Sequence, residues 1–471
     1  MDRATDLCSM DACDLVRGYA ARTFSPMEVL EAVLRRTAEL NPRFNAFFHL
    51  MEEEAMAAAS ESQQRWMAGT PMGPLDGVPV SIKDSIAAKN TPMWRGAKAY
   101  MDRPHSTSDS PPAARLRESG ALLFAKTTMP DFGMFGAGVS SAHGITRNPW
   151  NPAFNTGGSS SGGAAALAAR LGPLTVGSDI AGSVRLPSGM CGLATLKPTQ
   201  GRIPHLPPSP IRSAGPLARS VRDVALMMTV LSRPDVRDYG SLAPDLLSYQ
   251  DHLDIEVRGL KIGLLLDMGF GLDVESPVRD AVLAAAQVLE RAGATVEVMP
   301  ALLDMDASAA LDQIFSVRSR IELSHLPVEK HEGVHPLVRQ LCARADSFSA
   351  VEYGAATDLI EGAKSRVMER TSAFDYVLAP VLPTVNFAAD QVAPNADDLL
   401  SVASFTCMFN QTGQPVASAC CGFDERGLPI GVQIIGRRFD DSGVLALAHS
   451  YETLRGFTPQ WPVLKQPQSR G

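Results

Sequence analysis

The class of fold is decided by residues 260–299, which read LKIGLLLDMGFGLDVESPVRDAVLAAAQVLERAGATVEVM. The apolar run 260–266 has the length and composition of a buried strand. A helix is predicted to begin at Ser276, because a proline follows and apolar residues then recur at helical spacing, and Gly293 can end it. A second strand is predicted over 294–299. A strand, a helix and a strand in succession indicate an α/β protein.

The same alternation continues outward in both directions along the chain. Short apolar runs with the length of buried strands lie on both sides of the central unit, and segments with helical spacing separate some of them. We therefore predict a single large α/β domain with a central twisted mixed β-sheet flanked by helices. The predicted strands are 78–82, 121–125, 174–176, 374–378 and 430–435, and the predicted helices include 112–118 and 441–454.

An N-terminal helical segment, residues 1–70, is predicted to pack on this domain. Ser25 can cap a helix, and Glu28 stands where it completes a capping box. Apolar residues follow at helical spacing, so we expect the helix to span 25–41 and to end at Pro42.

Two other segments show no regular periodicity. Residues 234–256 are a weak candidate for a linker between domains. Residues 456–471 form a C-terminal tail, and the polar, proline-containing part from Pro459 onward is expected to be loose.

The bulk composition is that of an ordinary globular protein and excludes several classes of partner. Of 471 residues, 45% are hydrophobic and 20% charged, and the net charge is −8 with no dense run of Lys or Arg. These values argue against nucleic acid or an anionic membrane surface as the main partner. We expect no signal peptide and no transmembrane helix, because no apolar stretch of about 18 residues exists.

The seven cysteines and nine histidines form no recognisable metal or disulfide pattern. The cysteine count is odd and the spacing scattered, with no pair of CxxC motifs and no HExxH. We predict reduced, mostly buried thiols in a cytoplasmic protein, and no metal site.

A Ser/Gly-rich stretch at 155–163, NTGGSSSGG, directly precedes an Ala-rich helix over 164–171. A flexible linker would be oddly placed before a helix inside a continuous apolar region. A phosphate-binding loop would need GxxxxGK[ST], and no lysine stands in that place. The third interpretation is a tight active-site loop, in which glycines let backbone approach backbone and serines point into a cavity.

A second small-residue segment lies at 177–185, GSDIAGSVR. The turn before Ser183 can aim successive N–H groups at one point, as an oxyanion hole requires, and a purely structural turn is the alternative. Neither segment contains histidine and GxSxG is absent, so a Ser-His-Asp triad has no sequence support. Lys83 ends an apolar strand, where burial could lower its pKa from about 10.4, although a lone lysine is more often a surface residue.

Together these segments resemble the amidase signature family, from about residue 25 to about residue 454. The resemblance implies an amidase domain over 71–455, with catalytic motifs at 73–204 and a substrate-shaping half at 205–455. The ordered central set is far more specific than any single glycine loop. The matching stretches are 73–79 with Lys83 and Asp84, 146–152, 157–163, 177–185, 191–192, 196–199, 409–415 and 427–433.

The resemblance implies a Ser-cis-Ser-Lys triad that hydrolyses a linear amide C–N bond through an acyl-enzyme, without a cofactor. Neutral Lys83 would take a proton through Ser159 from the nucleophile Ser183. The two serines stand 24 positions apart, from 159 to 183, and the peptide bond before Ser159 is expected to be cis. The expected oxyanion donors are the backbone N–H groups of Ile180, Ala181, Gly182 and Ser183. The expected supporting residues are Ser160, Asp179 and Arg185, with a structural salt bridge as the alternative role of the last two.

The chain departs from the family pattern at positions that concern the substrate. Ala181 replaces a glycine that is common in the turn, and its methyl group could narrow the acyl site. Gly133 and Met134, between Phe132 and Phe135, are candidates for lining the acyl pocket, with core packing as the alternative. The further departures are Thr156, residues 93–97 and Cys420.

Three hypotheses about function stay open. The first is a stand-alone amidase that acts on a small-molecule amide, and a homodimer is compatible with it. The second is the glutamine-hydrolysing subunit of a tRNA-dependent amidotransferase; such members usually have glutamine after the arginine of the nucleophile motif, where this chain has Leu186. The third, a non-catalytic scaffold, would be indicated by loss of a triad residue, and all three are present.

Overall fold

The central strand–helix–strand unit is present in the computed structural model, which describes residues 7–244 and 247–464. Lys261–Leu264 form β9, Ser276–Arg291 form α9 and Thr295–Val298 form β10. The two strands pair in parallel, the arrangement that a helical crossover produces.

The main sheet is built from strands spread over the whole chain. Besides β9 and β10 they are β1 (Phe47–Leu50), β2 (Pro79–Lys83), β3 (Leu122–Thr127), β6 (Leu174–Asp179), β7 (Ala194–Lys197), β8 (Ser213–Ala218), β11 (Tyr376–Pro380), β12 (Val416–Phe423) and β13 (Pro429–Ile435). In the described chain these make an 11-stranded sheet in the order β1-β3-β2-β6-β8-β7-β12-β13-β11-β9-β10. The short strands β4 (Val139–Ser140) and β5 (Gly144–Ile145) pair separately.

The pairing within the sheet is mixed. β2 runs parallel to both of its neighbours, β3 and β6, whereas β12 runs antiparallel to β7 and β13. The predicted α/β fold with a large mixed sheet is therefore confirmed.

Helices cover both faces of this sheet. On one face α8 (Val221–Leu231), α9 and α14 (Asp441–Leu454) pack on the strands, and on the other face lie α6 (Ser161–Ala168) and α7 (Arg185–Cys191). Every residue of α6 and α7 is buried, which explains why their sequences show no polar face. The two serine-bearing segments thus lead directly into the most enclosed helices of the fold.

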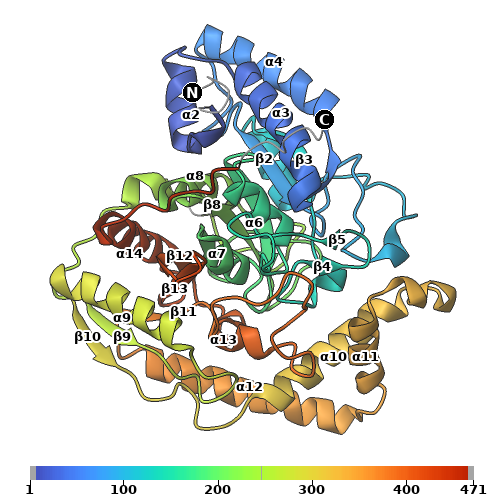
Figure 1. Ribbon diagram of the computed structural model, residues 1–471, viewed down its shortest axis with the longest axis vertical. Coiled ribbons are helices and arrows are strands. Elements are labelled where there is room, and N and C mark those ends of the chain that lie inside the picture. Colours follow the sequence, from blue (N-terminus) through green and yellow to red (C-terminus); the bar gives the residue numbers. More distant parts are fainter. Residues whose placement is uncertain (1–6, 245–246, 465–471) are drawn as a thin grey trace.

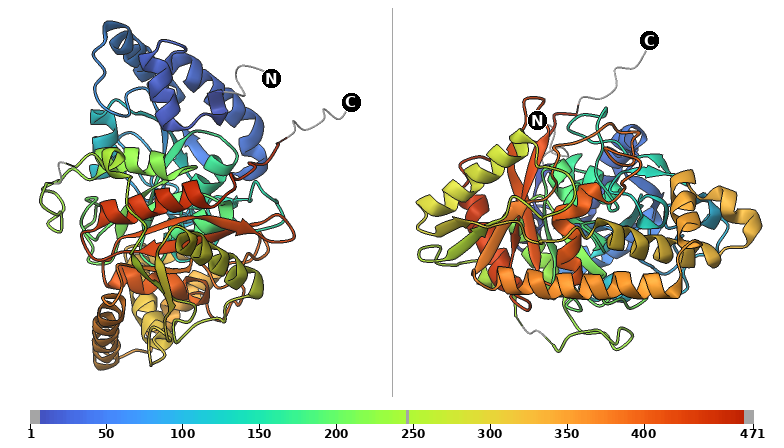
Figure 2. Two further views of the ribbon diagram at one scale, coloured as in Figure 1. Left: turned by 90° about the vertical axis from the view of Figure 1, so that its left-hand side faces the viewer. Right: turned by 90° about the horizontal axis from the view of Figure 1, so that it is seen from below.

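Two helical groups lie at opposite ends of the molecule (Figures 1 and 2). The N-terminal group carries α2 (Ala12–Ala20), α3 (Pro26–Phe44) and α4 (Glu52–Ala68). The group at the other end consists of α10 (Ser308–Ser324), α11 (Pro336–Ala345) and α12 (Ala350–Thr371), which were not predicted from the sequence. The remaining α-helices of the described chain are α5 (Pro111–Glu118) and α13 (Ser404–Gln411).

Helix α3 begins as predicted but ends later than predicted. Ser25 and Glu28 form the expected capping box, yet the helix continues past Pro42 to Phe44. Pro42 lies in the last turn of the helix. It lacks the N–H group that would donate to the preceding turn, and the helix continues for only two residues after it. Asn45, in the left-handed region with φ 52°, then ends it.

The two segments without periodicity are more closely packed than expected. Tyr249, within the linker candidate, is buried, and its short 3₁₀ turn packs against α8 and α14, so the segment does not separate two domains. In the tail the Trp461 ring packs on the domain, with its centroid 5.7 Å from that of the Trp150 ring, whereas Val463 is exposed. The rest of the expected loose tail lies outside the described residues.

All seven cysteines fall in the described part of the chain, where they are buried free thiols as predicted. No helix among residues 7–244 and 247–464 is long and apolar enough to cross a bilayer.

Candidate active site

Lys83 and the Ser183 turn meet at one edge of the sheet because β2 and β6 are adjacent parallel strands. The carboxyl ends of such strands lie at the same edge. Lys83 is the last residue of β2, and the turn 180–183 follows Asp179, the last residue of β6. The structure therefore brings together two segments that stand about a hundred positions apart in the sequence.

The Lys83 side chain is buried, not a surface lysine. It is 1% exposed, and its Nζ donates to Ser159 Oγ at 2.9 Å and to the Ser178 carbonyl oxygen at 3.2 Å. Burial lowers the pKa of the amine to about 7, although Asp179 and Asp84 act in the opposite direction. A large fraction of Lys83 is therefore neutral near pH 7 and able to accept a proton.

Two further lysines are buried and have lowered pKa values, but their contacts differ. Burial lowers the pKa of Lys197 to about 7 and that of Lys126 to about 8. Lys126 donates to the carbonyl oxygens of Asp84 and Ile86, and Lys197 donates to that of Pro198. Of these three lysines only Lys83 contacts a side-chain hydroxyl, so it alone is placed to exchange a proton with a serine.

Ser159 lies in a tightly packed loop just before α6. The Gly158–Ser159 peptide bond is cis, as the resemblance implies. Gly158 is required because a Cβ there would lie 2.4 Å from the Ala137 carbonyl oxygen. The buried amide of Asn155 fixes the loop, since its Oδ1 accepts from the N–H groups of Gly157 and Gly138, both at 2.9 Å.

Ser183 is one of the few accessible residues in an otherwise buried stretch. From residue 171 to residue 191 every residue is buried except Ile180, Ala181 and Ser183. Ser159 and Ser183 line the same small cavity, which encloses about 320 Å³. The two loops are joined by the Ser160 N–H, which donates to the Ser183 carbonyl oxygen at 3.1 Å.

The turn before Ser183 differs in one respect from the expected oxyanion site. The Gly182 N–H donates to Asp179 Oδ1 at 2.7 Å, so this group is engaged in holding the turn and is not free for an oxyanion. Within the described structure no backbone hydrogen bond uses the N–H groups of Ile180, Ala181 or Ser183. Gly182 is nevertheless required, because its φ is +122° and a Cβ would lie 2.3 Å from Thr406 Oγ1.

A buried ion pair between Arg185 and Asp179 stabilises the turn 180–183. Arg185 donates through Nε and Nη2 to the Asp179 carboxylate at 3.1 and 3.0 Å, and both side chains are fully buried. The guanidinium holds the pKa of Asp179 well below its usual range despite burial. Asn410 and Gln433 accept from the same guanidinium, at 2.6 and 3.4 Å. These last two positions lie in stretches that the resemblance covers, but no local signal assigned them this task.

Asp84, next to Lys83, organises the loop after β2. Its carboxylate accepts from the N–H groups of Trp94 and Gly96, at 2.7 and 2.8 Å, and lies 3.2 Å from His143 Nε2. The contacts of this buried carboxylate keep its pKa below the usual range although burial alone would raise it. Asp84 belongs to a motif that was recognised in the sequence, but its partner His143 was not predicted.

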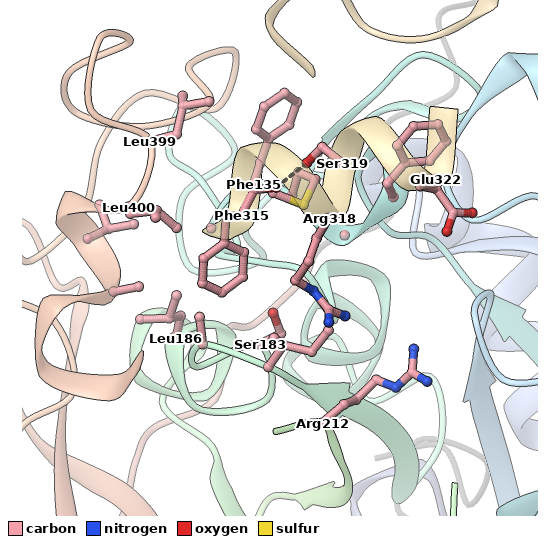
Figure 3. Close-up of a pocket in the computed structure, with 18 of the residues that line it drawn as sticks. Phe135, Ser183, Leu186, Arg212, Phe315, Arg318, Ser319, Glu322, Leu399 and Leu400 are labelled. Carbon is pink, nitrogen blue, oxygen red and sulfur yellow. Dashed lines mark hydrogen bonds between the residues drawn. The ribbon is translucent and has the colours of Figure 1, made fainter. Parts of the chain in front are cut away.

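A larger pocket opens above Ser183 and encloses about 720 Å³, part of it open to solvent (Figure 3). Gly133 and Met134 line it, as do their neighbours Phe132 and Phe135, so the sequence candidates for an acyl pocket do lie beside Ser183. Its other apolar walls come from Leu186, Phe315, Leu399, Leu400, Val402 and Ala403.

The polar wall of this pocket was not predicted. Arg95, Arg212, Arg318 and Glu322 line it, and they come from three distant parts of the chain. Arg318 and Glu322 lie one turn apart on α10, which is one of the helices that were not predicted. No local motif marks these residues, because only the folded chain, in which α10 packs on α11 and α12, brings them to the pocket beside Ser183.

Known proteins resemble this chain over nearly its whole length. The family model described as Amidase matches residues 28–445. A glutamyl-tRNA(Gln) amidotransferase subunit of Chloroflexus aurantiacus is 32% identical, over 98% of this chain and 99% of the relative. An acylamidase of Rhodococcus erythropolis is 31% identical, over 96% of this chain and 97% of the relative. The crystal structure of a bacterial aryl acylamidase of the amidase signature family superposes with a TM-score of 0.89 at 28% identity, covering 98% of this chain and 99% of the other.

Proposed function

Because the chain belongs to the amidase signature family, we propose that it hydrolyses a carboxylic amide C–N bond through an acyl-enzyme on Ser183. The observation that supports this most strongly is the 2.9 Å contact between Lys83 Nζ and Ser159 Oγ, in a cavity that Ser183 also lines. The lowered pKa of Lys83 supplies a base near neutral pH, where an ordinary lysine would be protonated.

In the first half of the reaction Lys83 takes a proton from Ser159, which takes one from Ser183. The Ser183 Oγ forms a bond to the amide carbon, and the carbonyl electron pair moves onto oxygen. The N–H groups of Ile180, Ala181 and Ser183 are the donors left for this oxyanion, with Gly182 retained by Asp179. A well-placed donor of this kind contributes about 3–4 kcal/mol to the transition state.

In the second half the tetrahedral intermediate collapses. The C–N bond breaks, and the leaving nitrogen takes a proton from Ser159, which is reprotonated by the Lys83 ammonium. Water then attacks the acyl-enzyme and gives up its proton through Ser159 to Lys83. The C–O bond to Ser183 breaks, and the Ser183 oxygen recovers a proton from the same relay. The net change is one amide and one water converted to one acid and one amine.

The proposal is tested by locating the reactive serine. A fluorophosphonate probe should add to Ser183 in the native protein, as read by mass spectrometry of the labelled peptide, and Ser183→Ala should lose both labelling and hydrolysis of a panel of amides. Ser178→Ala is the matched control, because Ser178 lines the same cavity but its hydroxyl faces Ser85 at 3.4 Å. Labelling at another serine, or hydrolysis that survives in Ser183→Ala, would reject the assignment.

A second candidate is the glutaminase component of a tRNA-dependent amidotransferase, and the relative from Chloroflexus aurantiacus favours it. The pocket supports it less well. Glutamine carries an α-ammonium group, whereas the pocket's single acid, Glu322, already accepts from Arg95 and from the Tyr100 hydroxyl. Glutaminase activity that requires added partner proteins, with no hydrolysis of simple amides by the isolated chain, would reverse this order.

A further inference from the structure

We propose that the amide substrate carries a carboxylate, which the guanidinium groups of Arg212 and Arg318 bind in the pocket beside Ser183. This inference rests on the proposed function and names the substrate class of the same site. It follows from the charges that line the pocket, from the partners that these charges lack, and from the apolar character of the remaining walls.

The pocket holds more positive than negative charge. Three arginines line it, Arg95, Arg212 and Arg318, against one acid, Glu322. Glu322 is committed to Arg95, with which it forms an ion pair, and to the Tyr100 hydroxyl, which donates to it at 2.9 Å. Two guanidinium groups are therefore left without a carboxylate partner in the pocket.

Arg212 and Arg318 have unused hydrogen-bonding capacity. Arg212 donates to the Pro207 carbonyl oxygen, but its Nε is buried and has no hydrogen-bond partner in the described chain. The Arg318 side chain forms no hydrogen bond or ion pair with any residue that the structure describes. Its side chain extends from α10 toward Ser183 (Figure 3). A buried donor without a partner, such as the Arg212 Nε, is costly, so a ligand that supplies acceptors here is stabilised.

The arginines also repel one another. Burial, reinforced by Arg95 and Arg318, lowers the pKa of Arg212 to about 10. Burial is also the main cause of a lowered pKa of Arg318, and Arg95 contributes to it. An anion between two guanidinium groups replaces this repulsion with charge-assisted hydrogen bonds, and a carboxylate fits the planar fork of an arginine.

The other walls define the rest of the ligand. Phe135, Leu186, Phe315, Leu399 and Leu400 are apolar, and the described lining has no free acid that could receive a cation. Arg95 and Arg212 also line the small cavity that contains both serines, so the anion site is continuous with the reaction centre. The geometry fits an amide joined to a carboxylate through an apolar spacer, and disfavours amides that carry an ammonium group.

Two matched substrate pairs test the inference. On the acyl side, glutaramate is compared with glutaramide, in which a neutral carboxamide replaces the carboxylate. On the amine side, N-hexanoylglycine is compared with N-hexanoyl-propylamine. We expect the native chain to prefer the anionic member of at least one pair by about 10- to 100-fold in kcat/KM, the contribution of a charged hydrogen bond. The pair that shows the preference tells which side of the amide faces the arginines.

Variants of α10 connect that preference to Arg318. Arg318→Gln should lower the ratio of kcat/KM between the anionic and neutral members toward one, and Arg318→Lys should keep part of it. Arg320→Gln is the matched control, because Arg320 lies on the same helix but pairs with Asp346 at 2.7 Å on the exposed side; it should leave the ratio unchanged. Arg212→Gln should act in the same direction as Arg318→Gln.

The outcomes separate this inference from the proposed function. A native chain that hydrolyses the neutral amides equally well, or an Arg318→Gln chain that keeps the full preference, overturns the inference and leaves the amidase in place. If none of the four amides is hydrolysed, a binding experiment tests the inference instead. It measures how far glutarate and glutaramide protect Ser183 from labelling by the fluorophosphonate. Protection by glutarate but not by glutaramide, lost in Arg318→Gln, supports it, and equal protection overturns it. Failure of Ser183 to label at all overturns the proposed function itself.

Discussion

The floor and the wall of the pocket are built in different ways. The floor is formed by the loops 155–163 and 177–185. Their residues are nearly all buried, and a side chain in each loop accepts from a backbone N–H group of the same loop. The wall is formed by α10 and residues 399–403, and it presents Arg318 with no partner in the described chain. In the floor most polar side chains are held by other residues, and the N–H groups of Ile180, Ala181 and Ser183 stay available, whereas the wall offers the charged side chain of Arg318 to a ligand.

This difference separates reaction from recognition. A base and a nucleophile must be held within a few tenths of an ångström, which requires a rigid surrounding network such as the Asp179–Arg185 pair. A specificity wall needs only shape and charge, and its residues can change without disturbing the floor. The comparison predicts that substitutions in the floor abolish activity or stability, whereas those in the wall redistribute substrates.

The largest expected effect is that of Lys83→Met. Among the three buried lysines only Lys83 contacts a serine hydroxyl, so its removal should lower kcat/KM by about 10²–10⁴-fold, the contribution of a general base. Steady-state kinetics on the best amide of a panel measures it. Lys197→Met is the control, because Lys197 has a similarly lowered pKa but contacts only a carbonyl oxygen. If both variants lose kcat/KM equally, the activity depends on the presence of a buried lysine and not on the contact between Lys83 and Ser159.

A second prediction compares the stability of floor and wall. Asp179→Asn leaves Arg185 buried without a carboxylate and should cost about 3–5 kcal/mol of unfolding free energy. Glu322→Gln removes the partner of Arg95, a pair that is partly exposed, and should cost about 1 kcal/mol or less. Urea unfolding of the two variants measures both values. Similar losses would mean that the wall is as tightly constrained as the floor.

The smallest effect is expected where floor and wall meet. Ala181→Gly removes a methyl group that faces the pocket, and should raise the preference for branched over linear acyl groups by up to about tenfold. The ratio of kcat/KM for isobutyryl and butyryl amides measures the change. A ratio that does not move would place the acyl group elsewhere in the pocket.

The floor could be predicted from sequence to a greater extent than the wall. Local sequence patterns mark the short strands before Lys83 and after Pro173 and the small-residue loops that follow them. These patterns place the loops at the ends of strands. Two details needed the structure: the Gly182 N–H belongs to Asp179, and Lys83 is distinguished from Lys126 and Lys197 only by its contact with Ser159. Residues close in space but distant in sequence leave no local signal of such contacts.

The helices that form and support the wall show no sequence pattern from which they were predicted. The buried face of α12 carries small residues, such as Ala356 and Ala363, because α10 and α12 pack closely on each other and on neighbouring elements. The position of Arg318 depends on how α10 packs on α11 and α12, which is a tertiary property. The family was therefore predictable from the sequence, whereas the proposed binding of a carboxylate rests on residues that only the folded chain brings together.

The central claim, that Lys83 is a neutral base at working pH, is tested most directly by the pH dependence of Ser183 labelling. Lys83 is neutral above its lowered pKa, so the fluorophosphonate rate should rise with pH to a plateau, with its midpoint near the value of about 7. Below the midpoint the rate should fall about tenfold per pH unit. In Lys83→Met the rate should be low and this inflection absent. A Lys83→Met chain that keeps the same inflection, or a native rate that is flat from about pH 5 to about pH 9, would contradict the account.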